Sequence, residues 1–124
     1  MSSEQRNVTE VCRLADIEDG DARGFDVRSD EGPPIRLIVV RRDPNVFVYL
    51  NRCPHRGTPL DLAPDRFLDA ERRFLVCATH GAVFRLRDGV CVAGPCQGDG
   101  LRAITCEVRD GAIWATSLPP LAAR

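Results

Sequence analysis

The sequence predicts an all-β domain built from short antiparallel strands. Turn signals of the Asp–Gly and Pro type recur along the 124 residues, and the segments between them are short and rich in Val, Ile, Phe and Leu. No stretch longer than about ten residues carries the 3.6-residue period of an amphipathic helix. The chain contains no internal repeat. We therefore expect one domain over residues 1–124.

The first strand pair is predicted over "IRLIVVR" (35–41) and "VFVYL" (46–50), joined by a turn that contains Pro44. Farther along, "LDAERRF" (68–74) has room for one helical turn at most. The remainder of the chain between these segments offers only short runs that suit strands and loops.

Two "RDG" segments predict β-hairpins, because Asp–Gly suits a two-residue turn in which both residues have positive φ. The first lies at Asp88-Gly89 and the second at Asp110-Gly111. Before the second, Ile104, Cys106 and Val108 alternate with polar residues, so we expect these three side chains to face inward.

Composition excludes several classes of protein. The net charge is −1 and no basic stripe is present, so nucleic acid is not an expected partner. The polar N-terminus has no apolar segment of a secretory signal, and the longest apolar run, Leu37 to Val40, is too short to span a membrane. We therefore expect a cytoplasmic protein. Because thiols stay reduced there, its six cysteines favour metal binding over a disulfide framework.

The chain's only two histidines each follow a cysteine closely, as Cys53-x-His55 and Cys77-x-x-His80. Each pair comes directly after a predicted strand, "VFVYL" (46–50) for the first and "RFLVC" (73–77) for the second. Two loops at one end of the sheets can therefore converge on a metal. Two thiolates and two imidazoles form a complete ligand set. Two alternatives stay open: histidines with a purely structural role, and a structural zinc site. The single residue within Cys53-x-His55 is tight for one tetrahedral ion.

These motifs resemble the ligand motifs of the Rieske 2Fe–2S family, as do the surrounding residues "CPHRGTPL" at 53–60 and "HGAVFRLRDG" at 80–89. The segment "GVCVAGPCQGDGL" at 89–101 resembles the glycine–proline loop that covers the cluster in that family. The resemblance implies the Rieske fold, in which three antiparallel sheets stack and a subdomain binds the cluster through loops within about residues 46–100. It also implies one cluster per chain, with Cys53 and Cys77 on one iron and His55 and His80 on the other.

Three departures refine the comparison. Twenty-one residues separate His55 from Cys77, a longer gap than in the ferredoxins of ring hydroxylases, and we expect a surface excursion to absorb it. Thr58 and Thr79 stand where the respiratory members of the family have a cysteine pair, so the shielding disulfide of that type is not expected. The hydroxyl donors of that type are replaced by Ala82 and Phe84, which implies a low potential.

The resemblance implies an electron-transfer protein, a one-electron carrier between a flavoprotein reductase and a terminal oxygenase or oxidoreductase. A catalytic oxygenase subunit would need further histidines for its mononuclear iron, and none is left over. No substrate-transforming site is expected. The alternative is a redox-sensing or structural subunit that carries a cluster.

The remaining cysteines and two arginines have less specific roles. Cys106 is expected to pack as a small buried side chain, and Cys91 and Cys96 to serve packing or loop geometry, although a disulfide between these two stays open. Cys12 has no assigned role. Arg52 and Arg56 flank the first cysteine loop, as ordinary solvated charges or as contacts for an acidic partner.

Overall fold

The computed structural model consists of three antiparallel sheets, as the sequence predicts. It describes residues 8–28, 33–54, 57–61, 63–78, 81–95, 97–116 and 118. Its strands are β1 (Thr9–Arg13), β2 (Ala22–Val27), β3 (Ile35–Arg42), β4 (Asn45–Leu50), β5 (Phe74–Val76), β6 (Val83–Arg85), β7 (Cys91–Ala93), β8 (Ala103–Ile104), β9 (Cys106–Arg109) and β10 (Ala112–Ala115). The described helical structure is one 3₁₀ turn, η2 (Leu14–Asp16).

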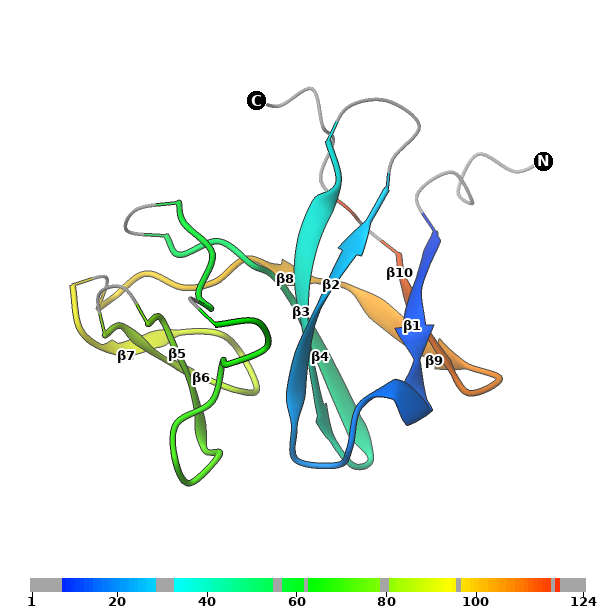
Figure 1. Ribbon diagram of the computed structural model, residues 1–124, viewed down its shortest axis with the longest axis horizontal. Helices are drawn as coiled ribbons and strands as arrows, with labels where there is room; N and C mark the ends of the chain where they lie inside the picture. Colours follow the sequence, from blue (N-terminus) through cyan, green and yellow to red (C-terminus); the bar gives the residue numbers. More distant parts are fainter. Residues whose placement is uncertain are drawn as a thin grey trace.

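The central sheet has the strand order β2-β3-β4-β8 and lies between the other two (Figure 1). The sheet β5-β6-β7 lies on one side of it, and the sheet β1-β10-β9 lies on the other. Two separate groups of buried side chains fill the spaces between the sheets. The sheet β5-β6-β7 carries the second cysteine loop, between β5 and β6.

Strand β3 explains the longest apolar run in the chain. Successive side chains of a strand point to opposite faces, so an uninterrupted apolar run requires both faces to be covered. Ile38 and Val40 belong to the core beside β5-β6-β7, whereas Leu37 and Val39 belong to the core beside β1-β10-β9. All four are at most 1% exposed. The central sheet therefore separates two hydrophobic cores and contributes side chains to both.

Both predicted hairpins are present. Asp110 and Gly111 have φ of 54° and 77° and connect β9 to β10, as expected for a two-residue turn with positive φ at both positions. The first hairpin joins β6 to β7 through a longer turn than the two-residue type expected, because the Arg85 N–H donates to the Val90 carbonyl at 3.0 Å. Of Asp88 and Gly89, only Gly89 has positive φ, 74°. A Cβ on Gly89 would come within 2.8 Å of the Tyr49 ring, so this glycine also permits close packing against β4.

The inward position predicted for Val108 is wrong, because this side chain is 47% exposed. Ile104 is buried in β8 and pairs with Val48 of the central sheet. The chain then leaves that sheet at Thr105, and β9 becomes an outer strand paired with β10. Cys106 still packs against the core at the start of β9, whereas Val108 extends beyond it.

The segment between the two cysteine loops is attached to the rest of the protein by a buried side chain and by hydrogen bonds. It is therefore held more firmly than the surface excursion expected from the sequence. It makes turns and no helix over the described residues 63–73. Phe67 is 1% exposed, lies in the core beside β5-β6-β7, and accepts a hydrogen bond from the Val76 N–H at 2.7 Å. The Asp65 carboxylate accepts a hydrogen bond from the Gly24 N–H at 2.8 Å, which ties the segment to β2.

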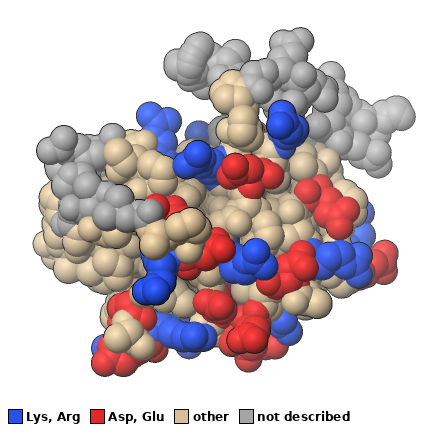
Figure 2. Space-filling model, in the orientation of Figure 1, with Lys and Arg blue, Asp and Glu red and all other residues tan. Residues whose placement is uncertain are grey.

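Charges of both signs are interspersed on the face shown in Figure 2, without a broad patch of either sign. This distribution agrees with a net charge of −1. No helix among the described residues has the length and apolar character needed to cross a membrane.

Candidate metal centre

The two cysteine loops share one backbone hydrogen-bond pattern. In the first, the Cys53 N–H donates to the Thr58 carbonyl at 2.7 Å, and the Gly57 N–H donates to the Cys53 carbonyl at 2.6 Å. In the second, the Cys77 N–H donates to the carbonyl of Ala82, and the Gly81 N–H donates to the carbonyl of Cys77, both at 2.8 Å. Each loop is thus closed around its cysteine by the residues four and five positions later.

A glycine with positive φ makes this shape possible in each loop. Gly57 has φ of 75° and Gly81 has φ of 74°. Residues with a side chain are strained in this region of backbone space, so glycine is the favoured residue at both positions. Although the cysteine-to-histidine spacings differ, the cysteine-to-glycine spacing is the same in the two loops.

Both cysteines are part of the protein interior. Cys53 and Cys77 are each 0% exposed and belong to the core that lies between β5-β6-β7 and the central sheet. Strand β4 leads to Cys53 and strand β5 leads to Cys77. The fold therefore brings two thiols from residues 24 positions apart into one buried cluster.

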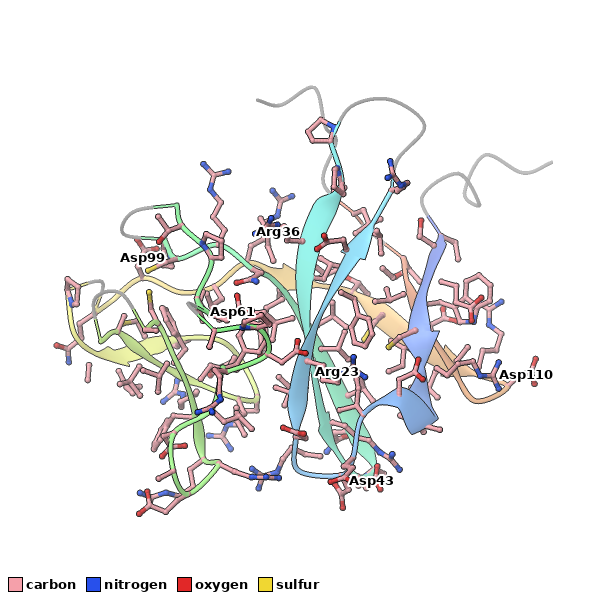
Figure 3. The ribbon with its side chains drawn as sticks, in the orientation of Figure 1. Arg23, Arg36, Asp43, Asp61, Asp99 and Asp110 are labelled. Atoms are coloured by element: carbon pink, nitrogen blue, oxygen red, sulfur yellow. The ribbon has the colours of Figure 1, made fainter. Side chains whose placement is uncertain are left out.

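Two consecutive hydrogen bonds through Leu60 link the two loops. The Asn51 side-chain carbonyl accepts from the Leu60 N–H at 2.8 Å, and the Leu60 carbonyl accepts from the Ala78 N–H at 2.9 Å. The Asn51 amide group donates to the Asp61 carboxylate at 3.1 Å, and Asp61 lies beside the central sheet (Figure 3). Asn51 is only 8% exposed, so its hydrogen bonds are sheltered from water.

Two of the four predicted ligands lie among the described residues, namely Cys53 and Cys77. His55 and His80 lie outside them, as do Thr79, Arg56 and Cys96. No group of three or more metal-ligating side chains gathers elsewhere in the described part of the chain. The complete ligand set therefore stays a prediction.

The described residues fit a sulfur-rich metal cluster on two grounds. Thiols such as those of Cys53 and Cys77 ligate iron–sulfur clusters when deprotonated. In addition, the Thr58 hydroxyl oxygen is buried without a hydrogen-bond partner among the described residues. A buried hydroxyl normally has a partner, so its position in the Cys53 loop indicates an acceptor that belongs to a bound group.

The glycine-rich segment after β7 packs directly onto the second cysteine loop. A Cβ on Gly94 would lie 2.7 Å from the Ala82 Cα and 3.2 Å from the Gly81 carbonyl oxygen. Gly94 also has φ of 98°. Gly94 thus lies directly against the second cysteine loop, and a larger residue at position 94 would displace it from that loop.

Three other described cysteines behave as packing residues. Burial, with a smaller effect of Asp16, raises the pKa of the Cys12 thiol to about 12, and this residue lies in the core on the far side of the central sheet. Burial also raises the pKa of Cys106, which packs against the same core. Cys91 is 2% exposed, and its Sγ lies 3.2 Å from the Ala93 carbonyl oxygen.

A cleft of about 350 Å³ opens beside the first cysteine loop. Arg52 and Arg102 contribute to its lining together with Cys53, Pro54 and Gly57. Both arginines are exposed. The loop containing Cys53 is therefore bordered by two cationic side chains, one of which was expected there from the sequence.

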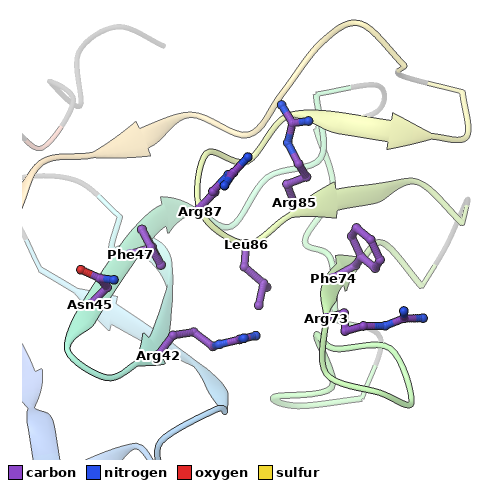
Figure 4. A pocket seen from close by; sticks show the side chains of 8 residues that line it. All are labelled: Arg42, Asn45, Phe47, Arg73, Phe74, Arg85, Leu86 and Arg87. Atoms are coloured by element: carbon purple, nitrogen blue, oxygen red, sulfur yellow. The ribbon is translucent and has the colours of Figure 1, made fainter.

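A second cleft, of about 340 Å³, lies at the other end of β5 and β6 (Figure 4). Arg42 extends beneath Leu86 in this view, and Arg85 pairs with Asp88 at 2.9 Å, an interaction that lowers the pKa of Asp88. Neither Cys53 nor Cys77 lines this cleft. It is therefore separate from the candidate metal centre.

Sequence reasoning missed Asn51 and Phe67. A polar residue two positions before a candidate ligand, directly after an apolar strand, was the available signal for Asn51. Phe67 is the one aromatic residue in the polar segment 63–73, and such a residue is a candidate anchor.

Three stacked antiparallel sheets with two matched cysteine loops at one end define a small iron–sulfur protein. The family model described as "Rieske [2Fe-2S] domain" matches residues 7–113. The chain therefore belongs to the Rieske family, and the cofactor of that family is a 2Fe–2S cluster. No curated protein gives a significant match to the sequence.

Solved structures of ferredoxins are similar over almost their whole length. The ferredoxin of carbazole 1,9a-dioxygenase from Nocardioides aromaticivorans IC177 is 26% identical, with a TM-score of 0.70 over 90% of this chain and 99% of that chain. The ferredoxin of Sphingomonas yanoikuyae B1 is 25% identical, with a TM-score of 0.68 over 90% of this chain and 100% of that chain.

A terminal oxygenase shares the fold over a smaller part of its length. The terminal oxygenase of carbazole 1,9a-dioxygenase from N. aromaticivorans IC177 is 18% identical, with a TM-score of 0.72 over 93% of this chain but only 31% of that chain. This likeness concerns the fold of one part of the oxygenase.

Proposed function

We propose that this protein is a ferredoxin component, which carries one electron at a time from a flavoprotein reductase to a terminal oxygenase or related oxidoreductase. The observation that carries the proposal is the pair of matched cysteine loops within a Rieske domain. Further support comes from the ferredoxins that the chain covers almost completely, at 25–26% identity. We also propose a single domain over residues 1–124 and a cytoplasmic location, where the remaining thiols would stay reduced.

We assign the cluster ligands to Cys53, His55, Cys77 and His80. What supports this assignment is the family motif, the burial of both cysteines and the closed loop around each. When bound, a 2Fe–2S cluster held by two thiolates and two imidazoles accepts and releases one electron. The protein's contribution is to fix the two thiols in a dry core and to hold the loops together through Asn51 and Leu60.

We place the contact with redox partners beside the first cysteine loop. Arg52 and Arg102 border the cleft next to Cys53, and both are exposed. Two exposed guanidinium groups favour an acidic partner surface, and such contacts are weak and sensitive to salt. Weak contacts suit a carrier that must leave one partner before it meets the next.

The first test is the metal content of protein expressed anaerobically with ample iron. We expect iron and acid-labile sulfide in equal amounts, a red-brown colour, and a rhombic EPR signal that develops on reduction. A colourless protein with one zinc per chain would overturn the proposal.

The second test is turnover. We expect a flavoprotein ferredoxin reductase with NADH to reduce the cluster, and an oxygenase with its substrate to reoxidise it repeatedly. The terminal oxygenase of carbazole 1,9a-dioxygenase is the first acceptor to use. A cluster that is reduced reversibly but supports no turnover with any reductase and oxygenase pair would instead favour the sensor or structural subunit.

A further inference from the structure

We propose that the Thr58 hydroxyl donates a hydrogen bond to a sulfur atom of the bound cluster and thereby raises its reduction potential. The inference rests on the proposed function, since it requires a cluster between the two cysteine loops. It adds a residue that tunes the cluster without ligating it.

The first argument is the state of the Thr58 side chain. Its Oγ1 atom is buried and has no hydrogen-bond partner among the described residues. Two described polar groups nearby are satisfied: the Thr58 carbonyl accepts from Cys53, and both ends of the Asn51 amide are bonded. A buried hydroxyl without a partner among the described residues indicates an acceptor supplied by the bound group.

The second argument is the position of Thr58 in the first loop. Its carbonyl oxygen lies 2.7 Å from the Cys53 nitrogen, so Thr58 closes the loop around the cysteine. The preceding residue, Gly57, donates to the Cys53 carbonyl at 2.6 Å. The backbone of Thr58 is thus fixed against the proposed ligand Cys53, in the loop that would hold the cluster.

The third argument is chemical complementarity. Thiolate and sulfide sulfurs accept hydrogen bonds and cannot donate them, whereas a threonine hydroxyl can rotate to donate. Thr58 is also the only hydroxyl-bearing residue among the described residues 53–54, 57–61, 77–78 and 81–82. Ala82 and Phe84, which are buried in the same core cluster as Cys53 and Cys77, carry no hydroxyl.

The effect on potential follows from charge. Reduction adds one negative charge to the cluster, so a hydrogen bond donated to a sulfur is stronger in the reduced state. A donor that favours the reduced state raises the potential. Thr58 would therefore set the potential above the value that the same loops would give without it.

The experiment is a redox titration of the holoprotein and three variants at neutral pH. Thr58→Val removes the hydroxyl and keeps the shape, Thr58→Ser keeps the hydroxyl, and Thr116→Val is the matched control. The Thr116 hydroxyl donates to the Thr105 carbonyl at 3.2 Å, beside the far sheet. Resonance Raman spectra of the Fe–S stretches in H₂O and D₂O provide a second readout.

We expect Thr58→Val to favour the oxidised state three- to tenfold, which corresponds to a fall of about 30–60 mV because 59 mV is tenfold for one electron. Thr58→Ser should stay near the wild type, and Thr116→Val should not shift. Part of the deuterium shift in the Fe–S bands should disappear in Thr58→Val. If Thr58→Val does not assemble a cluster, the same comparison is made with Thr58→Ala.

Three results would overturn the inference. They are an unchanged potential and unchanged deuterium shift in Thr58→Val, an equal fall in Thr58→Ser, or an equal fall in Thr116→Val. Failure of the wild-type protein to bind iron would instead remove the proposed function and this inference together. An intact EPR signal with an unchanged potential and an unchanged deuterium shift in Thr58→Val would remove only the inference.

Discussion

The Leu60 carbonyl oxygen accepts a hydrogen bond from the Ala78 N–H at 2.9 Å, and this bond joins the two cysteine loops directly. Leu60 is itself held by the Asn51 side chain, which accepts from the Leu60 N–H at 2.8 Å. The position of one cysteine loop relative to the other therefore depends on the buried side-chain amide of Asn51, a residue outside both ligand motifs. Cluster retention should be sensitive to that amide.

Replacing Asn51 with Ala should destabilise the protein and speed loss of the cluster. The change leaves the buried Leu60 N–H without its acceptor, which costs about 1–3 kcal/mol. Denaturant unfolding and the rate of bleaching of the visible absorbance with an iron chelator measure the two effects. Asn45→Ala, at an exposed position of β4, is the control and should change neither. Equal bleaching rates in the two variants would contradict a role for Asn51.

Replacing Gly94 with Ala should lower cluster occupancy more than replacing Gly98 with Ala. The two glycines have nearly the same φ, 98° and 95°, so the backbone strain is similar in both variants. Only at position 94 would the new Cβ clash, at 2.7 Å from the Ala82 Cα. Iron content per chain and the thermal midpoint of the holoprotein provide the measurement. Similar losses in both variants would mean that strain, and not contact with the second loop, dominates.

Replacing His55 or His80 with Ala should abolish the Rieske EPR signal. Each substitution removes one imidazole from the proposed ligand set, and metal binding and loop structure are coupled. Cys106→Ala is the control, because Cys106 packs against the far core and should affect only stability, modestly. Retention of the signal in both histidine variants, with its loss in Cys106→Ala, would show that the ligands are assigned wrongly.

Cys12 should resist alkylation in the native protein at pH 8. Burial raises its pKa from 9.0 to about 12, so almost no thiolate is present to react. Because the folded-state pKa is raised, the protonated thiol's contribution to stability is complete below pH 9 and is lost as the pH rises towards 12. Peptide mass spectrometry after iodoacetamide treatment measures the reaction, with the denatured chain as the reference. Labelling as fast as in the denatured chain would refute the shift.

The reduction potential of the wild-type protein should lie near the low end of the Rieske range, about −150 mV. Ala82 and Phe84 are both 0% exposed and provide no hydroxyl where the high-potential members have donors. Ala82→Ser and Phe84→Tyr should therefore raise the potential, each by tens of millivolts up to about 100 mV, since part of a charged hydrogen bond of about 1.5–3 kcal/mol depends on redox state. A redox titration at pH 7 is the measurement. A wild-type value above about +100 mV would contradict the low-potential class.

Local patterns in the sequence were sufficient to predict the β3–β4 strand pair and the two hairpins, but not β1 or β2. The run around Leu37 to Val40 predicts a strand, and the Asp110-Gly111 turn follows from backbone preferences alone. The inward position of Val108 was wrong because burial depends on how far the neighbouring core extends, which alternation along one strand does not encode. The change of sheet at Thr105 is a similar non-local event.

The candidate site was predicted in part. Cys53 and Cys77 lie in one buried cluster, as the spacing of their motifs implies. The anchoring of the intervening segment by Phe67 and Asp65 was not anticipated, since both contacts reach residues far away in the chain. The link from Asn51 through Leu60 to Ala78 was missed for the same reason, because a single polar residue does not reveal its distant partners.

The separation of the two cores by the central sheet makes the β9–β10 hairpin a suitable attachment point for a fluorophore. This hairpin packs on the side opposite the cysteine loops (Figure 1). All 17 basic residues of the chain are arginines, so no lysine side chain competes for an amine-directed reagent. Arg109→Lys at this exposed hairpin would supply a single reactive side-chain amine. A labelled protein could then be made without changing the cysteine loops.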